Sequence, residues 1–150
     1  MDGYALLKFA HVLLAIFAVG SNLTYGIWLG VAGGDRDRTA FALRGIKTLD
    51  RLANSAYGLL LVTGLALAFI GAIPFTTFWI AAALVLYVGA TVFGIFVYAP
   101  VLRQQVAVLE THGRESPEYH AIASRSTVLG IAVTLDIIAI VFLMVVKPTL

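Results

Sequence analysis

The sequence predicts an all-α membrane protein, a bundle of four transmembrane helices with both termini outside. Of its 150 residues, 61% are hydrophobic and only 12% are charged, and the mean hydropathy is +0.97. Soluble domains have about 45–50% apolar and about 25% charged residues. A chain this short cannot bury so much apolar surface in its own core. We therefore expect lipid to solvate much of it.

Long segments without charge define the expected helices. No charged residue occurs in 9–34 or in 52–102, and 126–146 contains one acid. A transmembrane helix needs about 20 apolar residues, so 52–102 must hold two helices. The turn signal Gly71–Pro74 divides it. We expect a single four-helix transmembrane domain covering 1–150, with spans at about 5–32, 53–72, 77–100 and 121–146.

The basic residues predict the orientation. Loops on the cytoplasmic side of a membrane are enriched in Lys and Arg. Lys8 and Lys147 lie on one side of the expected bundle. The other side carries eight basic residues: Arg36, Arg38, Arg44, Lys47, Arg51, Arg103, Arg114 and Arg125. We expect a multi-pass protein of the bacterial inner membrane with these loops in the cytoplasm.

Residues 36–52 are predicted to form an amphipathic cytoplasmic segment. Its expected apolar side consists of Phe41, Ile46, Leu49 and Leu52. Such a segment either lies on anionic lipid or extends the second span, and the alternative is a surface that binds a partner.

Polar and small residues recur every three or four positions along the spans. Because lipid offers no hydrogen bonds, these faces should point towards other helices. The predicted polar interior includes Asn22, Tyr25, Tyr57 and Thr91. A small-residue run on the first span suggests a homodimer through Gly26, Gly30 and Gly34. The basic residues adjoin membrane spans, so we expect lipid and not nucleic acid as the partner.

Asp136 is the most costly residue of the fourth span. A carboxylate at mid-membrane costs about 2.5–3.5 kcal/mol on insertion scales. Tyr87 and Thr63 lie at a similar expected depth, and their hydroxyls could satisfy it. Asp136, Tyr87 and Thr63 therefore form a candidate proton relay, or Asp136 is a protonated packing residue.

His11 is the one histidine inside an expected span, one turn from Lys8. A neutral imidazole binds haem or metals, or relays protons, but it can also be a satisfied buried side chain. The chain has no cysteine, and no spacing indicates a metal site. We find no motif of a known enzyme class, which leaves enzymatic activity undecided.

Three stretches carry a resemblance to known families: "LLKFAHVLLAIFAVG", "LLVTGLAL" and "FLMVVKP". They resemble a bacterial family of predicted integral membrane proteins of unknown function. The first is also distantly similar to the HemJ-like protoporphyrinogen oxidases and the CopD-like copper-resistance membrane domains, both four-helix groups. The HemJ-like resemblance implies that His11 is a haem ligand. That group also uses a lysine on the third helix, and this chain has none between Trp79 and Pro100.

These observations lead to one principal hypothesis and two alternatives. The principal hypothesis is a small haem-binding or redox-associated membrane protein, with haem b as cofactor. His11, with Lys8 as a further candidate, would bind it, and Asp136 would tune it or relay a proton. The first alternative is a proton-coupled transport or channel subunit acting as an oligomer. The second is a non-catalytic membrane scaffold.

Overall fold

The computed structural model describes residues 2–33 and 35–149, and within them it contains helices and no strand. Four continuous helical stretches are long and apolar enough to cross a membrane: Gly3–Val31, Arg36–Ile70, Phe78–His112 and Pro117–Val146. The predicted four-helix class is confirmed. The elements are α1 (Gly3–Val31), α2 (Arg36–Ile70), α3 (Phe78–Phe93), the π-helical η1 (Gly94–Tyr98), α4 (Ala99–His112) and α5 (Pro117–Val146).

Local sequence signals start and stop these helices. Asp35 caps α2, because its side chain accepts a hydrogen bond from the backbone N–H of Arg38 at 2.8 Å. Ser116 caps α5 in the same way, and Pro117 occupies the first turn, where its missing N–H costs nothing. Gly113 ends α4 with a φ of +77°, a conformation that glycine adopts without strain. The predicted break between the second and third spans is also present, since α2 ends at Ile70.

The amphipathic segment 36–52 is part of α2 and extends the second span, one of the two expected arrangements. The 35 residues of α2 measure about 52 Å at 1.5 Å per residue, well beyond the roughly 30 Å of a hydrocarbon core. The expected apolar side was partly wrong. Ile46 is buried, but Phe41 and Leu52 are exposed, and Leu43 is buried in their place. The buried side follows from the packing of α2 on α1 and α4.

The third helical stretch likewise continues past its expected end near residue 100, through η1 into α4. The first part of α2, the helix α4 and the start of α5 form an apolar core around Leu43, Leu109 and Tyr119. Arg36 donates a hydrogen bond to the backbone carbonyl of Glu110 at 2.9 Å and ties α2 to α4. We call this part of the molecule, which also carries the connection between α4 and α5 at 113–116, the basic end.

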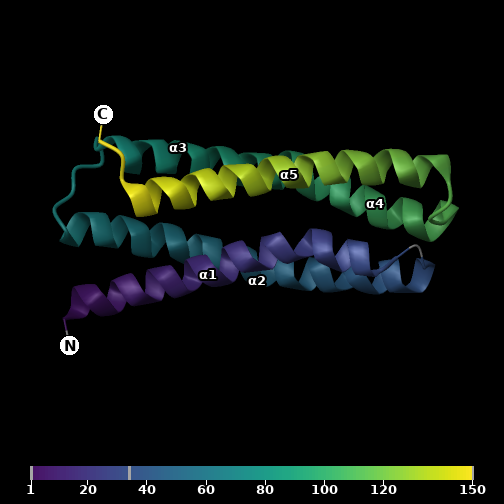
Figure 1. The fold of residues 1–150 in the computed structure, drawn as a ribbon, viewed down its shortest axis with the longest axis horizontal. Helices are drawn as coiled ribbons and strands as arrows, with labels where there is room; N and C mark the ends of the chain where they lie inside the picture. Colours follow the sequence, from purple (N-terminus) through teal and green to yellow (C-terminus); the bar gives the residue numbers. More distant parts are fainter. Residues whose placement is uncertain (1, 34, 150) are drawn as a thin grey trace.

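The helices form two pairs that separate at the other end. α1 packs along α2, while α5 packs along α3 and α4. Figure 1 shows the pairs close together at the basic end and apart where the two termini lie. Among the described residues the backbones of α2 and α3 do not approach each other closely, although the two helices follow one another in the chain. This divergence opens a space between the pairs, in the half of the bundle next to the termini.

Candidate functional site

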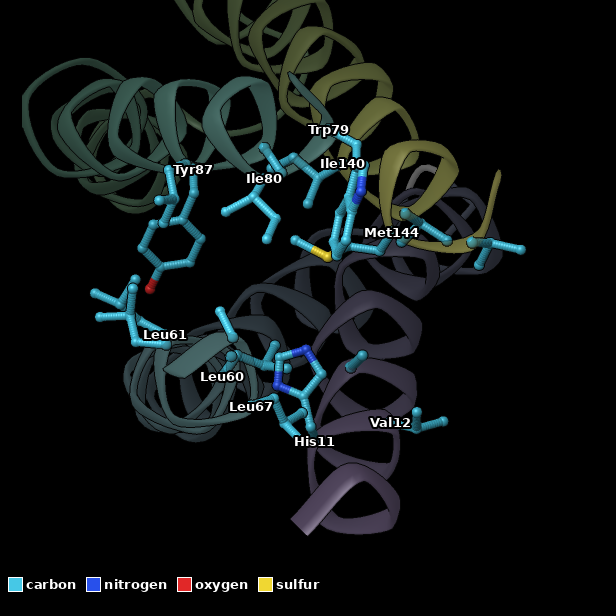
Figure 2. Close-up of a pocket in the computed structure, with 18 of the residues that line it drawn as sticks. His11, Val12, Leu60, Leu61, Leu67, Trp79, Ile80, Tyr87, Ile140 and Met144 are labelled. Carbon is cyan, nitrogen blue, oxygen red and sulfur yellow. The ribbon is translucent and has the colours of Figure 1, made fainter. Parts of the chain in front are cut away.

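The space between the helix pairs is an apolar pocket of about 470 Å³. This volume falls within the roughly 300–1,000 Å³ typical of small-molecule sites. Its walls come from α1, α2, α3 and α5, and most of its lining side chains are aliphatic or aromatic. Figure 2 shows Leu60 and Leu61 on one side and Ile80 and Ile140 on the other. The pocket therefore suits a large apolar ligand.

His11 places an imidazole in this pocket. Its Nδ1 lies 2.7 Å from the hydroxyl oxygen of Thr63 on α2. The hydroxyl of Thr63 also lies 2.8 Å from the backbone carbonyl of Leu59 and 3.2 Å from that of Leu60, and when it donates to one of these its oxygen accepts from His11. Nδ1 then carries the proton, and the neutral ring keeps a free electron pair on Nε2. In Figure 2 the nitrogen distal from the backbone points into the pocket, towards Met144 and Trp79.

Gly64 makes room for this ring. A Cβ at Gly64 would lie 3.1 Å from Cε1 of His11, closer than side chains normally approach. The imidazole therefore rests against the bare backbone of α2, one residue after its partner Thr63. Gly64 is a positioning residue, because its missing side chain leaves the space that the ring of His11 occupies.

Further groups at the pocket could contact a polar or charged ligand. The thioether of Met144 on α5 lines it, and Figure 2 shows this sulfur on the side facing His11. Lys8 and Lys147 also line it, near the two termini, and the ammonium of Lys147 lies 5.1 Å from the ring centre of Trp79. No acidic residue is among the described lining residues. The terminal side of the pocket is therefore positively charged.

Hydrogen bonds close the pocket on the side of the basic end. The amide of Asn22 donates to the hydroxyl of Tyr57 at 2.7 Å and to the carbonyl of Ala18 at 3.1 Å. The hydroxyl of Tyr87 on α3 donates to the backbone carbonyl of Tyr57 at 2.9 Å and bridges the two helix pairs. Asn22, Tyr25 and Tyr57 were predicted to lie in the polar interior, and none of the three is exposed.

The expected cluster around Asp136 is wrong in its contacts. Thr63 contacts His11 and Tyr87 contacts Tyr57, so neither hydroxyl reaches Asp136. Oδ2 of Asp136 is buried without a hydrogen-bond partner among the described residues. Asp136 does not line the pocket that holds His11, although its neighbour Ile137 does.

Thr91 is also not part of the interior. It is exposed, and its hydroxyl donates to the carbonyl of Tyr87 in its own helix at 2.8 Å. Such a bond satisfies a threonine that faces lipid, so its polarity did not indicate an inward face.

Two glycines of the small-residue run on α1 have open space beside them. Gly26 and Gly30 are exposed, and a Cβ at either position would meet no atom within 4 Å. Gly34 lies outside the described residues. In the described part of the chain, no three His, Cys, Asp or Glu side chains are grouped to hold a metal ion.

The fold and the pocket define an integral membrane protein of four helical spans with a lateral apolar site. The chain belongs to the family described as predicted integral membrane protein (DUF2269), whose model matches residues 5–148. No curated protein and no solved structure gives a significant match to the chain.

Proposed function

We propose that the protein binds haem b in the pocket between the helix pairs, with His11 as an axial ligand. The observation that carries this proposal is the imidazole of His11, whose Nδ1–H is held by Thr63 while Nε2 faces an apolar pocket. Histidines that bind metals usually donate their other ring N–H to a fixed partner, which sets the tautomer and orients the ring.

The other lining residues fit the same group. Met144 faces His11 from α5, and a thioether is a known partner of histidine in haem ligation. Lys8 and Lys147 would pair with the two propionates, since these are the charged groups of haem. The aliphatic walls would exclude water from the macrocycle. A bound haem would supply one-electron transfer, and this chain would contribute binding and orientation.

An absorption spectrum tests the proposal. We expect protein purified in detergent with added haem to show a Soret band, with sharpened visible bands after reduction by dithionite. The variant His11→Ala should lose the visible bands of the ligated haem. The matched control is His112→Ala, which removes an exposed histidine at the basic end and should leave the spectrum unchanged. The proposal fails if parent protein and His11→Ala give the same spectrum.

Replacing Thr63 tests how His11 is held. Thr63→Val keeps the shape but removes the acceptor for Nδ1–H, and we expect haem affinity to fall about 10–100-fold. Thr63→Ser keeps the hydroxyl and should restore affinity. Thr91→Val is the matched control, because the hydroxyl of Thr91 bonds its own helix and serves no partner. Haem titration of the four proteins measures the effect, and equal affinities for Thr63→Val and Thr91→Val would contradict it.

We further propose that the basic end lies in the cytoplasm of a bacterial cell, with the pocket in the outer half of the inner membrane. The eight basic residues at that end support this orientation by the positive-inside bias. The open glycine face at Gly26 and Gly30 supports a homodimer. It allows the helix of a second copy to approach α1 closely.

A further inference from the structure

A second, smaller cavity lies between α1 and α5, nearer the basic end, with a volume of about 180 Å³. We call it the hydroxyl cavity. Half of its lining side chains are polar: Asn22, Tyr25, Tyr98, Ser126, Thr127 and Thr134. None of them carries a charge at neutral pH. The lining of the hydroxyl cavity carries more hydroxyl groups than that of the apolar pocket, although the hydroxyls of Thr127 and Thr134 donate to carbonyls of their own helix.

Tyr25 presents an unpartnered hydroxyl there. Its side chain is only 6% exposed, yet its hydroxyl has no hydrogen-bond partner among the described residues. Ser126, 5% exposed, lines the same cavity. Buried hydroxyls in native proteins are almost always hydrogen-bonded, and a missing partner costs about 1–3 kcal/mol. A cavity with several polar groups and this volume has room for ordered water, which would supply the partner.

The backbone around Tyr98 favours the same conclusion. Tyr98 ends the π-helical segment η1, and such segments occur mostly as single turns, frequently at functional sites. Its ring lies against Gly130 on α5, where a Cβ would meet the hydroxyl oxygen at 3.7 Å. The π-helical turn and the missing side chain of Gly130 together allow Tyr98, which lies between α3 and α4, to reach the cavity.

The hydroxyl cavity ends one hydrogen bond from the apolar pocket. Asn22 lines the hydroxyl cavity, Tyr57 lines the apolar pocket, and the two side chains are joined at 2.7 Å. We propose that the hydroxyl cavity is a water site that extends as far as Asn22. The bond between Asn22 and Tyr57 separates this water from the dry apolar pocket.

Cysteine labelling tests this proposal without reference to haem. The chain has no cysteine, so each single-cysteine variant carries one reactive thiol. The thiolate of a cysteine attacks the sulfur of a methanethiosulfonate reagent and displaces sulfinate, and the thiolate forms in water and not in a dry apolar site. We expect Ser126→Cys, in the full-length protein in liposomes, to react at least about tenfold faster than cysteine at dry positions.

Two matched controls define the dry positions. The first is Ala83→Cys, because Ala83 lines the apolar pocket and is 1% exposed. The second is Val128→Cys, because Val128 is 63% exposed on the lipid-facing side of α5. The result that overturns the water site is Ser126→Cys reacting no faster than these two. If Ala83→Cys reacts as fast as Ser126→Cys, the separation by Asn22 and Tyr57 is wrong.

The melting temperature of Tyr25→Phe provides a second test, because a wet cavity and a dry cavity predict changes of opposite sign. If a water molecule is hydrogen-bonded to the hydroxyl of Tyr25, the variant leaves that water without a partner. The melting temperature then falls relative to the parent. If the cavity is dry, the variant removes an unpaired polar group and the melting temperature rises. A rise would overturn the proposal. Tyr4→Phe, outside the hydroxyl cavity, is the control.

Discussion

Gly64→Leu is expected to displace His11 and abolish haem binding. Even a single Cβ at this position would lie 3.1 Å from the imidazole, and the larger leucine side chain occupies the space of the ring. Overpacking of this kind costs about 1–3 kcal/mol. The displaced ring also loses its hydrogen bond to Thr63, so Nε2 no longer faces the pocket. Haem titration followed by the Soret band, together with thermal unfolding, measures both effects.

Gly58→Leu is the matched control for this experiment. Gly58 lies on the same helix, is exposed, and has open space where its Cβ would stand. Both substitutions change helix propensity equally, since leucine favours a helix more than glycine does. The difference between the two variants therefore isolates the clash with His11. Equal stability and equal haem binding in both would show that the ring does not rest on Gly64.

Leu109→Ala is expected to give the largest loss of stability at the basic end. Leu109 is 2% exposed and packs in the core with Leu43 and Tyr119. Removing a buried leucine side chain typically costs about 2–5 kcal/mol, depending on how far the cavity collapses. The helices join at this end and diverge at the other, so a weakened core also loosens the pairing that shapes the pocket.

Thermal unfolding followed by circular dichroism measures the effect of Leu109→Ala. Leu52→Ala is the control, because Leu52 on α2 is 53% exposed and its truncation leaves no cavity. We expect the melting temperature of Leu109→Ala to fall well below that of Leu52→Ala. Similar melting temperatures for the two would contradict the assignment of a packed core to the basic end.

The membrane-spanning helices could be predicted from the sequence because hydropathy and charge report directly on the surrounding lipid. The turn at Gly71–Pro74 could also be predicted, because glycine and proline end helices locally. The sequence did not decide whether 36–52 is a separate helix or part of α2. A charged surface helix and an apolar span have the same helical period, so their pattern shows no boundary between them. No glycine–proline signal separates 36–52 from the rest of α2, and the extension of α2 follows from its packing on α4.

The pocket could not be predicted, because it depends on the divergence of two helix pairs. The bond between His11 and Thr63 joins residues 52 positions apart, and spacing along one helix does not set the register between two. Depth alone had suggested Asp136 as the partner of Thr63. One signal was available: the small and polar stripes of the first two spans contain His11, Asn22, Tyr57 and Gly64. These residues do meet between α1 and α2.

Rescue of a cavity variant by imidazole tests the role of His11 most directly. His11→Gly removes the side chain and leaves space beside Gly64 for a free imidazole. We expect this variant with added haem to lack the visible bands of the ligated parent and to regain them when imidazole is added. Parent-like bands in His11→Gly before any imidazole is added would contradict His11 as the axial ligand.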